Sequence, residues 1–143
     1  MVTIPSTRFG SVEVTDDEVI DFPFGLIGLP GERYALLPQD VDSDFTWLHS
    51  VDDPHIAIPV TDPFRWFQAF TFALSDGDTG RIGTRDLGSA AIRVAIRMDG
   101  RTGGLTANLR APIVVLDGVG HQVINHSRGA SLRAPLTAAR VPA

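Results

Sequence analysis

The chain contains no cysteine and no lysine, so all twelve of its strongly basic residues are arginine. Without cysteine there is no disulfide framework, no thiolate nucleophile and no zinc ribbon. Without lysine there is no Walker-type phosphate loop, no Schiff base and no lysine general base. No apolar run approaches the roughly 18 residues of a membrane span, and the N-terminal segment has no charged start followed by an apolar core. These absences indicate a cytoplasmic protein and exclude several classes of enzyme.

The composition is that of one globular domain. Of the 143 residues, 43% are hydrophobic and 20% are charged, which argues against a disordered chain. A domain of this length can bury roughly two thirds of the surface that its unfolded chain exposes. We expect a single domain over residues 1–136, followed by a disordered tail over residues 137–143.

Short β-type segments separated by turn residues dominate the pattern. In Ala90 to Arg97 every second residue is apolar on one face, which is typical of a half-buried strand. Similar patterns predict strands over residues 2–7, 12–15, 34–37, 46–50, 56–61, 70–75, 105–110, 113–116 and 121–125. Asp62-Pro63 predicts one helical turn, and Ser75 to Ile82 predicts another. Many short strands at close spacing predict a mainly β fold, either a small β-barrel or a sandwich, with one or two short helices.

Acidic and basic residues are divided along the chain. Residues 1–62 hold twelve Asp or Glu and two Arg, a net charge of −10, whereas residues 63–143 hold five Asp and ten Arg, a net charge of +5. The acidic half is either a solvated surface or a surface for a basic partner, because such a division creates a strong local field. The overall charge of −5 argues against direct binding of nucleic acid.

The segment from His49 to His55 superficially offers a nucleophile in Ser50 and acids in Asp52 and Asp53. A catalytic triad needs a strained nucleophile turn, such as Gly-x-Ser-x-Gly, and an oxyanion hole. Ser50 has no glycine near it in the sequence. The sequence therefore favours a turn at Asp52 and Asp53, and a small serine hydrolase is the weaker alternative.

Asp40, Asp42 and Asp44 resemble the first ligands of a calcium-binding loop. In such a loop the sixth position is normally glycine and the twelfth a bidentate glutamate. Here these positions hold Phe45 and Val51. The pattern predicts an acidic loop without a dedicated metal site, and no other segment predicts a cofactor.

Two further sets of residues are candidates for contact with a partner. Most aromatic residues from Phe64 to Phe72 are expected in the core, but Trp66 or Phe67 is a candidate exposed anchor. Asn108 lies on the polar face of its expected strand, shortly before Pro112, which cannot donate to a ladder. It is either a partner contact or a buried amide that binds backbone groups, and the second interpretation is favoured.

Four phrases stand in a specific order: Phe22 to Gly28, Trp47 to Pro54, Val60 to Phe64, and Asn108 to Ile113. Each is weak alone, but together they resemble the FliW family of flagellar assembly factors, from about residue 4 to residue 136. The chain differs from the usual family pattern at three positions. His49 stands where the family usually has Gln, Leu29 where it has an aromatic residue, and Arg110 where it often has Lys.

The resemblance implies a non-enzymatic cytoplasmic protein, and of the two β folds it favours a small antiparallel or mixed barrel-like domain (a pseudobarrel) with one or two short helices. It further implies two protein partners: newly made flagellin, and the translational repressor CsrA, a small basic RNA-binding dimer. No membrane contact is implied, and a monomer is the simplest expectation. The acidic half then suits CsrA and an apolar groove suits flagellin, so the candidate partner contacts are Asp42, Asp44, Asp52, Asp53, Trp66, Phe67, Asn108 and Arg110. A β-fold scaffold for another basic partner is the alternative.

Overall fold

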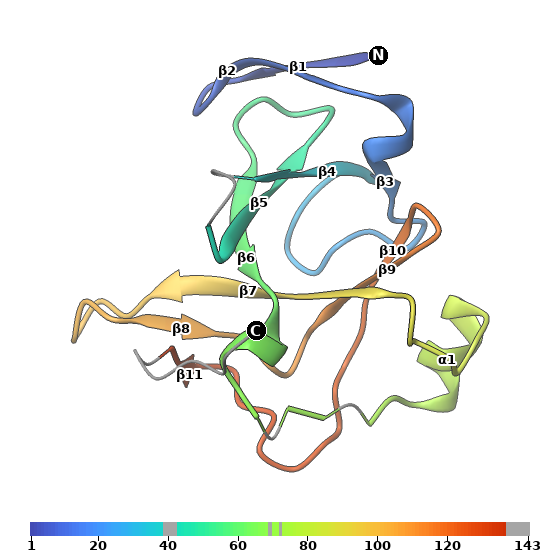
Figure 1. The fold of residues 1–143 in the computed structure, drawn as a ribbon, viewed down its shortest axis with the longest axis vertical. Helices are drawn as coiled ribbons and strands as arrows, with labels where there is room; N and C mark the ends of the chain where they lie inside the picture. Colours follow the sequence, from blue (N-terminus) through green and yellow to red (C-terminus); the bar gives the residue numbers. More distant parts are fainter. Residues whose placement is uncertain (39–42, 69, 72, 137–143) are drawn as a thin grey trace.

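The computed structural model describes residues 1–38, 43–68, 70–71 and 73–136, which form a β-barrel with covering layers on its outside (Figure 1). Within this part of the chain seven strands make the barrel, in the order β7-β6-β5-β4-β3-β10-β9, and β9 pairs with β7 to close it. Among the strands of the described residues only β3 and β10 run parallel, so the expected antiparallel or mixed barrel is confirmed, and it is of the mixed kind. The strands are β3 (Val19–Asp21), β4 (Arg33–Pro38), β5 (Phe45–Ser50), β6 (Ala57–Thr61), β7 (Ala91–Met98), β9 (Ile113–Leu116) and β10 (Val119–Gln122).

The barrel interior holds one of three hydrophobic clusters. Tyr34 is fully buried there, and its hydroxyl donates a hydrogen bond of 2.6 Å to the carbonyl oxygen of Pro30. Phe22, also fully buried, packs edge-on against the Tyr34 ring. This contact fixes the start of the connection between β3 and β4, because both rings are fully buried in the interior. The interior cluster consists of Ile20, Phe22, Leu26, Tyr34, Leu48, Val60 and Ile113.

Strand β7 contacts three other strands. Its first part pairs with β9 and its middle with β6, while its last part pairs with β8 (Leu105–Ala107). A short strand, β11 (Ala134–Pro135), extends the sheet beyond β8. β8 and β9 therefore share one edge of β7, and the chain between them leaves the sheet.

Two layers cover the barrel from outside. The hairpin of β1 (Val2–Ser6) and β2 (Gly10–Val14) packs Ile4 and Val14 onto the outer face of β4 and β5. On another side, the chain segments that precede β7 and follow β10 pack onto β7 and β9. That second cluster consists of Phe70, Ile92, Val94, Ala107, Leu109, Val114, Val123 and Ala134.

The two expected helical turns are confirmed. Helix α1 (Asp76–Ile82) begins at Ser75, whose hydroxyl accepts a hydrogen bond of 3.1 Å from the amide of Asp78. It ends at Gly83, whose φ of 91° is in the left-handed region that glycine tolerates. The turn η2 (Pro63–Arg65) is capped by Asp62 in the same way. The capping interactions at the two ends of α1 thus compensate for the low helix propensity of the glycines inside it.

Several expected boundaries were wrong. No strand forms in the described part of residues 70–75, although its residues alternate; this segment is held instead by the side chain of Asn125, as described below. The strand expected over 105–110 ends at Ala107, and the one expected over 121–125 is β10, ending at Gln122. The short strands β3 and β11 and the acidic turn η1 (Asp16–Glu18) were not predicted. The tail over residues 137–143 lies outside the described residues.

None of the helices in the described ranges is long and apolar enough to cross a membrane.

Candidate protein-binding site

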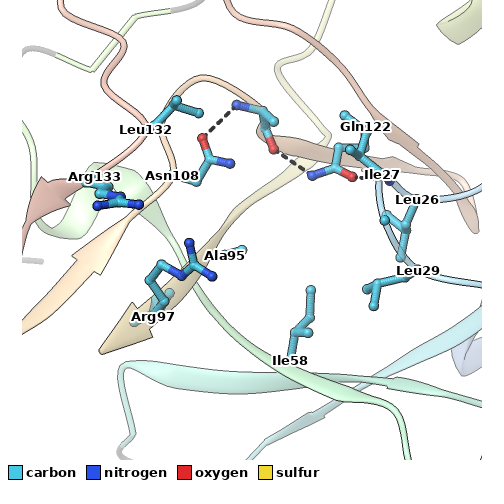
Figure 2. A pocket seen from close by; sticks show the side chains of 13 residues that line it. Leu26, Ile27, Leu29, Ile58, Ala95, Arg97, Asn108, Gln122, Leu132 and Arg133 are labelled. Atoms are coloured by element: carbon cyan, nitrogen blue, oxygen red, sulfur yellow. Dashed lines mark hydrogen bonds between the residues drawn. The ribbon is translucent and has the colours of Figure 1, made fainter. Parts of the chain in front are cut away.

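A cavity of about 450 Å³ opens at one end of the barrel (Figure 2). We call it the barrel-mouth pocket. Its volume is within the range of roughly 300–1,000 Å³ that is common for ligand sites in proteins. It is lined by Leu26, Ile27, Gly28, Leu29, Ile58, Ala95, Ile96, Arg97, Asn108, Ala111, Gln122, Leu132 and Arg133.

The pocket forms where the ladder between β6 and β7 stops. The two strands pair at Thr61 with Val94 and at Val60 with Ala95. The next residue of β6 is Pro59, which has no N–H to continue the ladder. Beyond it the strands no longer pair, and Ile58 lines the cavity. The opening is therefore encoded by a proline inside a barrel strand.

A chain of hydrogen bonds holds the upper rim of the pocket (Figure 2). The amide of Ala111 donates to Asn108 Oδ1 at 3.2 Å, and Gln122 Nε2 donates to the carbonyl of Ala111 at 3.1 Å. Gln122 Oε1 in turn accepts from the amide of Ile27 at 2.7 Å. The connection between β3 and β4 is thereby tied to the connection between β8 and β9, which keeps the pocket preformed.

Asn108 has the structural role that the sequence favoured, and its role as a partner contact stays a prediction. Its Oδ1 also accepts a hydrogen bond of 3.0 Å from the backbone amide of Arg110, and the backbone amide of Asn108 donates to the carbonyl of Ala95. These bonds support the structural role ahead of Pro112. The side-chain nitrogen of Asn108 lies on the cavity side in Figure 2, so a hydrogen-bond donor faces the cavity. Arg110 itself is exposed, and its Nε donates to the carbonyl of Ala130 at 3.2 Å.

The pocket combines an apolar wall with positive charge. Leu26, Leu29 and Ile58 form one side, and the guanidinium groups of Arg97 and Arg133 lie on the other (Figure 2). Among the residues that the structure describes, no aspartate or glutamate lines this pocket. In a protein with a net charge of −5, this pocket is a basic and apolar site.

Acidic residues gather elsewhere in the molecule. The turn η1 presents Asp16, Asp17 and Glu18, all exposed, in one turn. Glu18 Oε1 accepts from the amide of Thr15 at 2.8 Å, and this bond lowers the pKa of Glu18. Asp16 lies 3.6 Å from the N-terminal amine. We call these three carboxylates the acidic turn.

The charge division in the sequence becomes a division in space. In Figure 1 the hairpin β1–β2 and strands β3, β4 and β5 lie in the upper part of the view, while β7, β8 and α1 lie in the lower part. The acidic half of the chain supplies the first set and the arginine-rich half the second. The two ends of the molecule therefore differ in the sign of their field.

Two of the candidate carboxylates have intramolecular roles. Asp52 binds the guanidinium of Arg33 through two hydrogen bonds of 2.5 and 3.4 Å, and this pair raises the pKa of Arg33. Both side chains are about half exposed, so the pair contributes little to stability. Asp53 Oδ1 accepts from the amide of His55 at 2.9 Å, which shapes the turn. A partner that contacts Asp52 must compete with Arg33.

The acidic loop is only partly described. Asp44 Oδ1 lies 3.7 Å from Arg65 Nη1, and Asp40 and Asp42 lie outside the described residues. Among the residues that are described, no group of three or more His, Cys, Asp or Glu side chains is placed to hold a metal ion.

The two aromatic candidates are partly buried. Trp66 Nε1 donates to Thr61 Oγ1 at 3.0 Å, and its ring stacks on Phe45 at a centroid distance of 5.8 Å. Phe67 packs against the cluster outside β7 and β9. Their role as partner anchors stays a prediction. Larger exposed fractions belong to Phe24, at 69%, and Phe64, at 48%.

The geometry around Ser50 does not suit a nucleophile. The side chain is buried, and its Oγ accepts hydrogen bonds from the amides of Asp52 and Asp53, at 3.2 and 2.9 Å. His49 is also buried and contacts Ser6 Oγ and the Ser50 carbonyl, each at 2.7 Å. These groups stabilise the turn after β5, so the residues proposed for a hydrolase have structural roles here.

His121 makes stability depend on pH. It is 8% exposed, and burial, aided by the nearby Arg81, lowers its pKa below the ordinary value of 6.5, with Asp78 opposing. The folded protein disfavours the charged imidazole. The stability that comes from keeping His121 neutral is therefore complete above pH 6.5 and is lost as the pH falls through the lower folded pKa.

We expect His121→Gln to reduce the loss of unfolding free energy between about pH 7.5 and about pH 5.5. Urea unfolding at both pH values checks this, with the exposed His126→Gln as the control; equal losses in wild type and His121→Gln would contradict it.

The sequence pointed to none of the charged residues of the barrel-mouth pocket. Arg97 was placed on the polar face of its strand, and that alternation was the only available signal. In the barrel this face is the inner one, because Ala95 lies opposite the core residue Val60. Arg133 is 36 positions away in the sequence, and only the chain path after β10 brings it to the same cavity.

Comparisons with known proteins agree with this architecture. The model of the family described as "FliW protein" matches residues 3–136. A flagellar assembly factor FliW from Azoarcus sp. (strain BH72) is 39% identical over 119 residues, covering 78% of this chain and 82% of that protein. One from Desulfitobacterium hafniense (strain Y51) is 32% identical over 133 residues, covering 91% and 88%. A crystal structure of the flagellar assembly factor FliW superposes with a TM-score of 0.81 at 25% identity, over 94% of this chain and 96% of the other. The chain therefore belongs to the FliW family of flagellar assembly factors.

Proposed function

We propose that this flagellar assembly factor is a non-enzymatic cytoplasmic partner switch that binds a CsrA-like repressor and newly made flagellin. When flagellin accumulates it occupies the factor, so the repressor is released and blocks flagellin translation. When flagellin is exported the factor binds the repressor again. The observation that carries this proposal is the family match over residues 3–136 in a chain whose acidic and basic residues lie on different parts of the fold.

The acidic turn supports the repressor half of the proposal. Its carboxylates are exposed on a rigid turn, and a CsrA-like dimer is basic because it binds RNA. Complementary fields speed association and favour the correct partner over others. The same negative charge repels RNA phosphates, so binding here opposes RNA binding by the repressor. Asp52 and Asp53 stay candidate contacts, but the bonds they already make reduce the charge that they offer.

Neutralising the acidic turn is expected to slow association with a CsrA-like dimer. In Asp16→Asn/Asp17→Asn the two lost charges are exposed, and the capping bonds between Thr15 and Glu18 remain. We expect the association rate at low salt to fall roughly three- to tenfold and its salt dependence to flatten, because steering by exposed charges is screened by salt. Surface plasmon resonance at low and high salt measures both quantities.

The matched control is Asp86→Asn/Asp99→Asn. It removes the same charge from the arginine-rich half, and asparagine keeps the acceptor atoms that bind Gly88 and Arg101. Equal slowing in both double variants would mean that net charge, not the acidic turn, governs association. Failure of the wild-type protein to bind either a CsrA-like dimer or flagellin would overturn the proposed function and favour a scaffold for another basic partner.

A further inference from the structure

We infer that the barrel-mouth pocket binds an apolar protein segment that carries a carboxylate beside its apolar side chains. The inference rests on the proposed function only for the identity of the partner, which is then flagellin. It assigns the site and the chemistry of recognition, and it separates this site from the surface that faces a basic repressor.

The apolar side of the pocket sets the first requirement. Leu26 is buried in the interior cluster, and Leu29 and Ile58 pack partly against it. The apolar surface continues over the rim through Ile27 and Leu132, which are 62% and 55% exposed. Exposed apolar side chains around a preformed cavity are typical of an interaction site. Because this surface extends beyond the cavity, it fits a polypeptide segment better than a small molecule.

The charge of the pocket sets the second requirement. Within the described residues neither Arg97 nor Arg133 forms an ion pair, and the pocket lining contains no carboxylate. A guanidinium binds a carboxylate through two parallel hydrogen bonds, which adds direction as well as energy. A neutral apolar segment would leave both cations without a partner, and a basic segment would be repelled.

The backbone of β7 sets a third requirement. The carbonyl of Ala95 accepts from Asn108 on the side of β8, so strand alternation directs the N–H and C=O of Ile96 toward β6. The residue of β6 that would pair there is Pro59, which has no N–H to donate. Ile96 lines the pocket, and with the side-chain nitrogen of Asn108 it offers an acceptor and a donor to a peptide backbone. Apolar, anionic and amide groups are the features of one acidic, apolar polypeptide segment.

The signs of charge separate the two proposed sites. The acidic turn lies between β2 and β3, whereas the arginines of the pocket come from β7 and from the segment before β11. A basic repressor that docks on the first surface has no electrostatic reason to enter the second. The two partners then compete only if their volumes overlap when both are bound, or if binding of one partner changes the conformation of the other site. They do not share a set of contact residues.

The test compares binding of purified monomeric flagellin to four proteins by isothermal titration calorimetry. In Arg97→Ala/Arg133→Ala we expect the dissociation constant to rise about tenfold, because two partly exposed charge pairs are lost. The control Arg101→Ala/Arg128→Ala removes the same charge from residues outside the pocket and should bind as the wild type does. Leu132→Ser, at an exposed rim position, should weaken binding without any change in charge.

A photo-crosslinking residue at position 132 identifies the bound segment. We expect it to capture a flagellin peptide with Asp or Glu among apolar residues, and the same probe at the exposed Phe64 should not capture that peptide. Wild-type affinity in the Arg97/Arg133 variant, or a captured segment without an acidic residue, would overturn the inference and leave the proposed function standing. Absence of flagellin binding by the wild-type protein would overturn both.

Discussion

Replacing Asn125 by leucine is expected to lower the free energy of unfolding by about 3–5 kcal/mol, because four backbone groups in buried or part-buried hydrogen bonds lose their partners at once. The side chain is 3% exposed. Its Oδ1 accepts from the amides of Ala73 and Ser127, at 3.0 and 3.1 Å, and its Nδ2 donates to the carbonyls of Thr71 and Leu109, at 2.8 and 3.3 Å. Leucine fills a similar space but satisfies none of these groups.

Urea unfolding followed by circular dichroism measures this loss. Asn125→Asp should also destabilise the protein, since a carboxylate still accepts from the two amides but places a charged oxygen against the two carbonyls. Gln68→Leu replaces an exposed amide and is the control, expected to change the unfolding free energy by no more than about 0.5 kcal/mol. A loss for Asn125→Leu as small as that of the control would show that the segment before α1 is held by other contacts.

The second large effect is expected at Gly120 in β10. A methyl group built on this residue would overlap three carbon atoms of the Phe22 ring. Phe22 is fully buried and packs against Tyr34, so the ring has no free space to enter. Overpacking of this kind costs about 1–3 kcal/mol or more, and Gly120→Ala should destabilise the protein by at least that amount.

The same substitution also tests how the pocket is held. Phe22 begins the connection that supplies Leu26 and Leu29 to the pocket wall, so a displaced ring should also weaken the proposed binding of flagellin. Gly120→Ala should destabilise the Phe22→Leu variant less than it destabilises the wild type, because the ring that it overlaps is absent there. Gly100→Ala, with no atom near its added methyl group, is the neutral control in thermal unfolding. Additive effects of Gly120→Ala and Phe22→Leu would contradict the proposed overlap.

Local patterns predicted those parts of the fold that depend on neighbours in the sequence. The alternation in Ala90 to Arg97 predicted β7, and the capping residues Ser75 and Asp62 marked the starts of α1 and η2. The alternation over residues 70–75 misled for a physical reason. Strand pairing needs a neighbouring edge, and here Asn125 satisfies backbone groups on either side of residue 72 instead.

The candidate site was less predictable because its members are far apart in the chain. Asp52 was a candidate for a free carboxylate, but it binds Arg33, 19 positions away. Asn108 was found from its sequence context, because the hydrogen bonds of its side-chain oxygen reach only two and three residues ahead. The barrel-mouth pocket had no local signal, since its wall comes from the connection after β3, from β6 and β7, and from the segment before β11.

The sequence by itself determined a mainly β fold of short strands, the short capped helix and an excess of acid in the first half, because strand alternation, capping and charge counts are local properties. It also carried the four phrases that place the chain in the FliW family. Only the tertiary structure decided which charges are free to meet a partner and where two arginines face an apolar wall. Those features depend on ladder closure around β7, on the missing N–H of Pro59 and on side chains that meet only after the chain has folded.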